Sequence, residues 1–169
     1  MSFSIRQLTE ADWEIYKDIR LKSLQSDPTS FSSTYETESQ FSQHDWQKDL
    51  LAPTKAIFGL FDNRQPIGIS FISIPKKDIS QSTAKLLGSW IDKKYRNKGL
   101  SNLLYDARIE WAKKHPTVER LIIAHYDYNI ASKASNQKHG FVFTHKETYE
   151  DGKTDLWYEL WVKPKPLER

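Results

Sequence analysis

Apolar and polar residues recur along this chain with two different periods, which predict a succession of strands and helices. Short apolar and aromatic runs bounded by turn residues are typical of strands, whereas apolar residues three and four positions apart are typical of amphipathic helices. We therefore expect strands at 4–8, 55–61, 66–74, 83–91, 118–126, 141–147 and 155–162, and helices at about 9–26, 44–51, 100–115 and 131–139. The polar segments 31–43 and 75–82 are expected to be loops.

The order of these elements predicts a mixed sheet. Consecutive strands joined by short turns favour antiparallel pairing, and the strand–helix–strand segment at 83–126 favours a parallel crossover. No repeat, linker or change in composition separates a second domain. We therefore expect an α/β (mixed α+β) fold in which residues 1–169 form one domain that ends in a short Pro-containing tail at 163–169.

Composition restricts the class of protein further. With 169 residues, of which 38% are hydrophobic and 13% aromatic, the chain is long enough and apolar enough to bury one core. The absence of cysteine excludes disulfides, thiolate zinc sites and a cysteine nucleophile. The five histidines show no ligand spacing, so no metal site is expected. A net charge of +3 is too small to indicate a nucleic-acid-binding protein.

Targeting signals are not evident either. The N-terminal residues lack the apolar segment of a secretory signal, and no apolar run approaches the length of a membrane span. We therefore expect a cytoplasmic protein whose partners include neither a membrane nor nucleic acid. A homodimer remains open, because nothing in the sequence reports the oligomeric state.

The most informative segment is 86–104, where an apolar run ends in a basic turn that leads directly into an amphipathic helix. Gly99 has no Cβ, so an anion can approach the backbone closely there. Free N–H groups at a helix start, at the positive end of its dipole, favour a phosphate. Further positive charge around the turn comes from Lys93, Lys94, Arg96 and Lys98. The alternative is an ordinary basic turn on a solvated surface.

This turn resembles the acyl-CoA pyrophosphate loop of the GNAT N-acetyltransferase superfamily. The family pattern is Gln/Arg-x-x-Gly-x-Gly/Ala after a central strand, and it is met here by Arg96 and Gly99, with Ser101 in the last small position. A second family segment corresponds to residues 129–141. Its matching positions are Asn129, Lys138, Gly140 and Phe141, whereas Ser132 replaces the usual Ala and Asn136 the usual Tyr.

The resemblance covers nearly the whole chain and implies a twisted mixed sheet of about seven strands with helices on both faces. It implies an N-acetyltransferase that takes acetyl-CoA as co-substrate, needs no metal, and acts on an amine acceptor, either a small molecule or a peptide. The cofactor-binding residues that it implies are Ile91, Arg96, Asn97, Lys98, Gly99, Leu100, Ser101, Asn129, Ser132 and Asn136.

Candidate catalytic groups follow from the chemistry of thioester aminolysis. In many relatives the Tyr at the position of Asn136 is thought to protonate the departing CoA sulfur, which an amide cannot usefully do. The substitute is then Tyr126, Tyr128, Ser132 or Ser135, with Tyr126 and Ser135 as our candidates, or the thiolate leaves unaided because a thiol pKa is near 8.5. The carboxylates in the 31–43 loop are candidates for the acceptor side: Glu36 as a base, with Glu36 and Glu38 as substrate-binding residues.

Two readings of the function remain open at this point. The leading one is transfer of an acetyl group to a primary amine by direct attack on the thioester. The alternative is a non-catalytic acyl-CoA-binding sensor or interaction module of the same fold, which the Asn at position 136 favours. His125 is a further candidate for the base, but it alternates with apolar residues and is equally consistent with a packed side chain.

Overall fold

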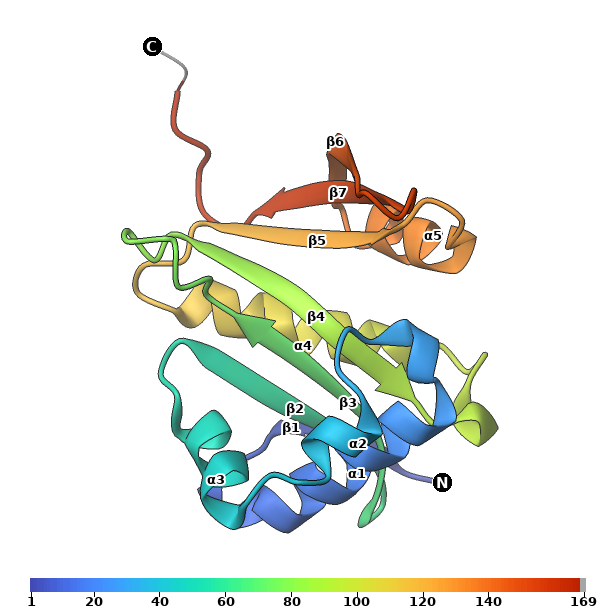
Figure 1. Cartoon of the computed structure of the whole chain (residues 1–169). Coiled ribbons are helices and arrows are strands. Elements are labelled where there is room, and N and C mark those ends of the chain that lie inside the picture. Colours follow the sequence, from blue (N-terminus) through green and yellow to red (C-terminus); the bar gives the residue numbers. More distant parts are fainter. Residues whose placement is uncertain (168–169) are drawn as a thin grey trace. The chain divides into compact units, whose positions relative to one another are not determined.

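The computed structural model of this chain describes residues 1–167 (Figure 1). The last two residues of the predicted tail 163–169, Glu168 and Arg169, lie outside the described residues. The strands are β1 (Phe3–Gln7), β2 (Lys55–Asp62), β3 (Gln65–Ser73), β4 (Thr83–Ile91), β5 (Arg120–Tyr126), β6 (Val142–Thr148) and β7 (Thr154–Trp161). The helices are α1 (Trp13–Ser26), α2 (Tyr35–Glu38), α3 (Gln43–Leu51), α4 (Ser101–Lys114) and α5 (Ile130–Lys138), with 3₁₀ turns η1 (Glu10–Asp12), η2 (Pro28–Ser30) and η3 (Lys93–Tyr95).

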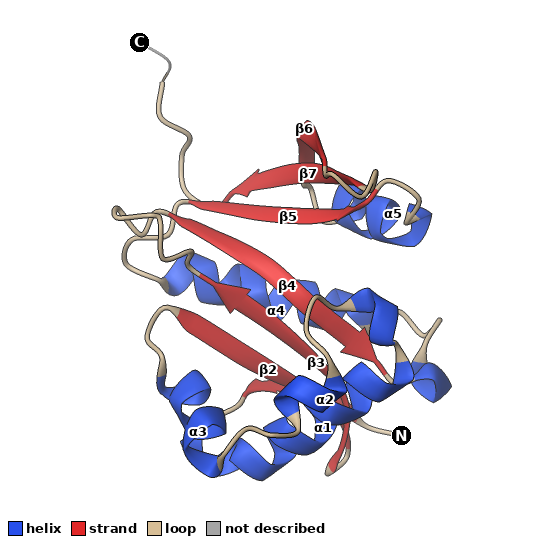
Figure 2. Ribbon diagram, in the orientation of Figure 1, coloured by secondary structure: helices blue, strands red, loops and turns tan. Residues whose placement is uncertain are grey.

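The predicted mixed sheet of seven strands is confirmed. The strands are hydrogen-bonded in the order β1-β2-β3-β4-β5-β7-β6 (Figure 2). The pairs β1–β2, β2–β3, β5–β7 and β6–β7 are antiparallel, whereas β4 and β5 run parallel. The crossover between the parallel strands contains α4, as the strand–helix–strand pattern predicts.

The described chain divides into two compact units, and β4 and α4 contribute to both. The first unit is built from residues 1–73 and 87–108, and the second from residues 74–86 and the chain from residue 109 onward. No helix within residues 1–167 is long and apolar enough to cross a membrane.

In the first unit, helices pack against the strands through two separate apolar clusters. One joins Tyr16 and Ile19 of α1 and Trp46 of α3 to β-strand residues that include Phe71 and Trp90. The other joins the start of α4 to the neighbouring strands through Leu60, Ile67, Leu100 and Leu104. This arrangement places helices on both faces of the strands, as the predicted fold requires.

In the second unit, β5, β7 and β6 form an antiparallel sheet. Leu121 and His125 of β5 are buried, and the His125 ring stacks on the buried ring of Tyr158 at 5.3 Å between centroids. The imidazole is thus a packed side chain, as the alternation with apolar residues indicates. The side chains of β6 are all exposed, and β6 is the last strand in the order of the sheet.

One local prediction is wrong in detail. The segment 31–43 is not entirely a loop, because residues 35–38 form α2, whose N-terminus is capped by the hydroxyl of Thr34 accepting from the N–H of Thr37 at 3.2 Å. A helix of one turn is too short to show an apolar period in sequence. On α4, the buried stripe includes the charged residue Arg108, which is 1% exposed and which the apolar pattern alone passes over.

Candidate functional site

The turn between η3 and α4 has an irregular backbone. Asn97 has φ of 62° and Gly99 has φ of 73°, so two left-handed residues flank Lys98. Alternating backbone conformations of this kind turn successive N–H groups toward a common point and form an anion-binding concavity. A Cβ at residue 99 would meet only the Asn102 side chain, at 3.6 Å, so the Gly is required by the backbone conformation and not by crowding.

The N–H groups of this turn are available to a ligand. Within residues 1–167, no backbone hydrogen bond is donated by the N–H of any residue from 97 to 101. The first bonds at the start of α4 are donated by the next two residues, from Asn102 to Gly99 at 3.2 Å and from Leu103 to Leu100 at 3.1 Å. Asn97, Lys98 and Gly99 are exposed, so the turn can receive a phosphate at the positive end of the α4 dipole.

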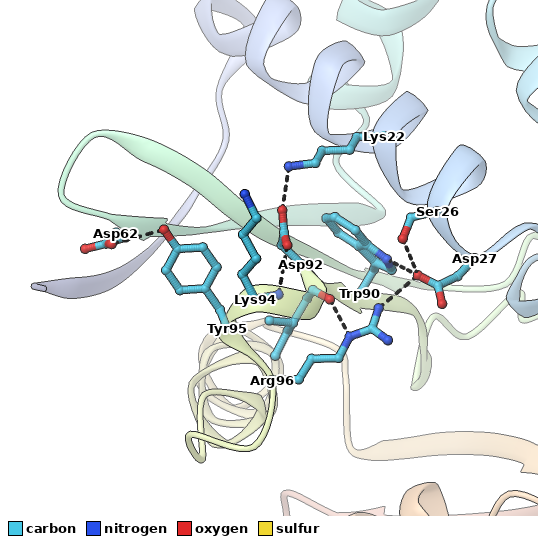
Figure 3. A network of polar contacts seen from close by, with 10 residues as sticks. Lys22, Ser26, Asp27, Asp62, Trp90, Asp92, Lys94, Tyr95 and Arg96 are labelled. Carbon is cyan, nitrogen blue, oxygen red and sulfur yellow. Dashed lines mark hydrogen bonds and ion pairs between the residues drawn. The ribbon is translucent and has the colours of Figure 1, made fainter.

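The side chain of Arg96 is engaged within the protein. Its Nε donates to the carbonyl oxygen of Ile91 at 2.7 Å, and its Nη2 donates to Oδ2 of Asp27 at 2.9 Å (Figure 3). Burial opposes ionisation of Asp27, but hydrogen bonds from Arg96, Trp90 and Ser26 outweigh it and lower the carboxyl pKa to about 2. The exposed cations near the turn are therefore Lys93, Lys94 and Lys98.

Two further contacts hold the segment that leads into the turn. Lys22 of α1 donates to Oδ2 of Asp92 at 2.5 Å, and Oδ1 of Asp92 accepts from the N–H of Lys94 at 3.0 Å (Figure 3). The Lys22 contact, followed by that of Lys94, lowers the pKa of Asp92 below its usual value. Tyr95 donates to Oδ2 of Asp62, at the end of β2, at 3.2 Å. The segment is thus tied to both α1 and β2.

The two candidate acids of the acceptor loop differ sharply. Glu36 is exposed, whereas Glu38 is buried and 7% exposed. Both carboxylate oxygens of Glu38 accept from the Arg20 guanidinium, at 2.9 and 2.8 Å. This pairing argues against the predicted contact of Glu38 with a substrate ammonium group, because the carboxylate already has a bidentate cationic partner. Glu36 has no such restraint.

The residues of the second family segment lie in the second unit. Asn129 caps α5, because its Oδ1 accepts from the N–H of Ser132 at 3.0 Å. Asn136 is fully buried. In the same helix, the backbone carbonyl of Ser135 accepts a hydrogen bond from Nδ1 of His139 at 2.8 Å. Asn129 therefore acts as the N-cap of α5. The Asn136 side chain belongs to the interior.

The acid candidates of this unit are half-buried. The ring of Tyr126 stacks on the exposed ring of Tyr128 at 5.3 Å, and Nζ of Lys153 lies 5.5 Å from the centre of the Tyr126 ring. Ser135 is half-buried on α5. These surroundings do not favour Tyr126 over Ser135 as a proton donor.

Sequence reasoning missed several residues that shape the site. Gly88 lies inside β4 with φ of 66°, and an added Cβ would come within 2.4 Å of the Phe71 ring. A Gly inside an apolar strand run was the available signal. Asp27 and Trp90 were also missed, because Asp27 lies just after the helix predicted at about 9–26 and no local pattern connects it with Trp90.

Neither the cavity described below nor a metal site involves the residues predicted for the functional site. A cavity of about 410 Å³ is lined by Glu10, His44, Gln47, Lys48, Leu51 and Ala52, none of which is a predicted site residue. Within residues 1–167, no three His, Cys, Asp or Glu side chains are grouped to hold a metal ion. The turn at 97–101 is therefore the feature that best fits a ligand.

Comparisons with known proteins point in the same direction. A family model described as the acetyltransferase (GNAT) family matches residues 13–141. Among solved structures, the chain is similar to a GNAT-family acetyltransferase from Streptococcus pneumoniae, with 23% identity, a TM-score of 0.77, and 95% of this chain and 99% of that chain covered. It is also similar to an N-acetyltransferase from Staphylococcus aureus Mu50, with 18% identity, a TM-score of 0.77, and coverage of 96% and 100%.

A third similar structure is the ribosomal-protein-S18-alanine N-acetyltransferase from Escherichia coli, with 15% identity, a TM-score of 0.68, and 98% of this chain and 97% of that chain covered. At these identities the likeness concerns the fold. No curated protein matches the chain in sequence. The family match spans both the 97–101 turn and the 129–141 segment.

Proposed function

Because this chain belongs to the acetyltransferase (GNAT) family and is thus an acetyl-CoA-dependent N-acetyltransferase, we propose that it acetylates a primary amine by direct attack on the thioester. The observation that carries this proposal is the turn at 97–101, where Asn97, Lys98 and Gly99 are exposed, two residues are left-handed, and within residues 1–167 no N–H from 97 to 101 donates a backbone hydrogen bond. A pyrophosphate is the ligand that such a turn fits.

We assign the pyrophosphate of acetyl-CoA to the backbone N–H groups of the 97–101 turn. Lys98 adds a flexible positive charge beside them, and Leu100 is buried beneath the turn, where it fixes the start of α4. Ile91 and Arg96 contribute to the site by supporting the turn. Asn129, Ser132 and Asn136 are kept as candidate cofactor contacts on the sequence resemblance.

In the proposed reaction, a neutral amine attacks the thioester carbonyl and forms a C–N bond. The nitrogen of the tetrahedral intermediate then loses a proton, the carbonyl re-forms and the C–S bond breaks, so that CoA leaves as a thiolate, or as a thiol once it takes up a proton. Before attack the ammonium form loses one proton, which Glu36 can accept through water. Positioning of the two reactants supplies up to about 7–11 kcal/mol. A proton donor, for which Tyr126 and Ser135 are candidates, adds roughly a hundred- to ten-thousand-fold.

A panel of amines tests the acceptor class. The similar Escherichia coli enzyme is named for an alanine of ribosomal protein S18, so a peptide α-amine belongs in the test set beside small amines. The assay is release of free CoA thiol with acetyl-CoA and a panel of amines. Turnover with any amine supports the proposal. Acetyl-CoA binding with no turnover for any amine would favour the alternative sensor or interaction module.

Three further features are proposed from the sequence. We expect residues 1–169 to act as a single GNAT domain, with the family match at 13–141 as support. We expect the enzyme to be cytoplasmic and to work without a metal or nucleic acid. A homodimer is the assembly to test, by light scattering of the purified protein.

A further inference from the structure

One carboxylate oxygen joins three separate parts of the first unit. Oδ2 of Asp27, at the end of α1, accepts from Nε1 of Trp90 at 2.6 Å, from Nη2 of Arg96 at 2.9 Å and from the hydroxyl of Ser26 at 2.9 Å. Trp90 lies on β4, and Arg96 is the residue directly before the turn at 97–101. Figure 3 shows the indole and the guanidinium converging on the same oxygen.

A second hydrogen bond fixes the orientation of the Arg96 side chain. Its Nε donates to the carbonyl of Ile91, the last residue of β4, while Nη2 reaches Asp27. A guanidinium is planar and its donors keep a fixed geometry, so two acceptors determine the orientation of the group. The side chain thus clamps residue 96 to β4 and α1 together.

The residue that follows this clamp has a strained backbone. Asn97 has φ of 62°, a conformation that costs a non-Gly residue free energy and persists where the surrounding structure enforces it. On one side Asn97 is held by Arg96, and on the other side α4 begins at Ser101.

We propose that Arg96 and Asp27 are positioning residues for acetyl-CoA: their ion pair holds the 97–101 turn in its anion-binding shape, and the guanidinium does not itself bind the phosphate. This inference rests on the proposed assignment of the pyrophosphate to the turn. It also connects the cofactor turn to the acceptor side, because the segment that follows Asp27 leads through η2 into α2, which carries Glu36.

The two roles of Arg96 predict opposite effects of Asp27→Asn. If Arg96 positions the turn, the loss of a charge-assisted bond loosens the clamp, and acetyl-CoA affinity falls about five- to tenfold. KM for acetyl-CoA rises by a similar factor, whereas kcat at saturation stays within about twofold. If Arg96 were a phosphate ligand, the same change would free its charge, and acetyl-CoA affinity would stay equal or increase.

A matched control separates this effect from a general loss of stability. Asp12 forms a bidentate ion pair with Arg6 at 2.8 and 2.9 Å, and its carboxyl pKa is also about 2. We expect Asp12→Asn to lower the melting temperature and to leave KM for acetyl-CoA unchanged. An equal rise in KM in both variants would overturn the positioning role of Asp27.

A double-mutant cycle tests whether Asp27 and Arg96 act as one unit. We expect Asp27→Ala, Arg96→Ala and the double variant to weaken acetyl-CoA binding by similar factors in calorimetry. Arg96→Gln should recover part of the affinity, because an amide can still donate to one of the two acceptors. Additive losses, or no recovery with Gln, would contradict the proposal.

The assignment of the turn itself is tested separately. If Gly99→Asp weakens acetyl-CoA binding but Asp27→Asn does not, the turn is the cofactor site and the positioning role is wrong. If the parent binds acetyl-CoA and Gly99→Asp binds equally well, the assignment of the pyrophosphate to the turn is wrong.

Discussion

Arg20 and Glu38 form a buried bidentate ion pair that fastens α2 to α1. The guanidinium donates to both carboxylate oxygens, and it also lies over the rings of Phe31 and Phe71, at 4.8 and 5.4 Å from their centres. The side chains of the pair are only 12% and 9% exposed. The pair thus fixes the short α2 helix and leaves Glu36, two residues earlier, in solvent.

We expect Glu38→Ala to destabilise the protein strongly. Removing one partner of a buried ion pair leaves the other charge uncompensated, which costs about 3–5 kcal/mol in the free energy of unfolding. Urea unfolding at neutral pH measures the change. Glu36→Ala is the matched control and should change stability by less than about 0.5 kcal/mol, because the residue is exposed. Equal effects of the two changes would contradict the structural role of Glu38.

Glu36 has a separate kinetic prediction. If its carboxylate binds or deprotonates the amine, Glu36→Gln raises KM for the amine or lowers kcat, while the affinity for acetyl-CoA in calorimetry is unchanged. The measurement needs the best amine found in the panel. Kinetics equal to those of the parent on every accepted amine would show that Glu36 is only a solvated acid.

Gly99→Asp should weaken acetyl-CoA binding at least tenfold. The new carboxylate repels the pyrophosphate, and the left-handed backbone at residue 99 disfavours a side chain. Gly152→Asp is a matched control, since Gly152 has φ of 83°, lies in the β6–β7 turn and has no atom within 4 Å of an added Cβ. We expect the control to bind acetyl-CoA like the parent, as judged by calorimetry.

Stability should fall as the pH decreases from about 4 toward 2. Asp12 and Asp27 have carboxyl pKa values of about 2 in the folded protein, against 3.8 as the ordinary value. A lowered pKa contributes stability that is present above the ordinary value and lost as the pH falls through the folded value. Urea unfolding measures the loss between about pH 4.5, which lies above the ordinary pKa, and about pH 2.5, which lies between the ordinary and the folded values. Asp12→Asn and Asp27→Asn should each lose less than the parent.

The parts of the fold that sequence predicts are those with long or distinctive patterns. The seven strands, the crossover helix and the basic turn at 97–101 are each visible in the printed chain. The burial of Arg108 is not, because a charged residue interrupts the apolar period that predicts a helix face. The contact of Arg96 with Asp27 is also invisible, because 69 positions separate the two residues and no local pattern connects them.

Local strand irregularities form a second class of features beyond sequence reasoning. The register of β2 against β3 shifts between Leu60 and Phe61, and Ile67 packs with Leu100 and Leu104, not with its strand neighbour Ile69. A bulge re-aims a side chain without changing the apolar pattern of the strand. The positive φ of Gly88 belongs to the same class, since a single Gly in a strand does not reveal its conformation.

The identity of the proton donor is the last prediction. If Tyr126 protonates the CoA sulfur, Tyr126→Phe should lower kcat about a hundredfold, whereas Ser135→Ala should change it little; the reverse holds if Ser135 is the donor. Tyr128→Phe and Ser132→Ala test the other two possible donors; Tyr128 stacks on Tyr126 and is 68% exposed. The assay is steady-state CoA release across pH with the best amine. If all four variants stay within about tenfold of the parent, CoA leaves as an unassisted thiolate, consistent with a thiol pKa near 8.5.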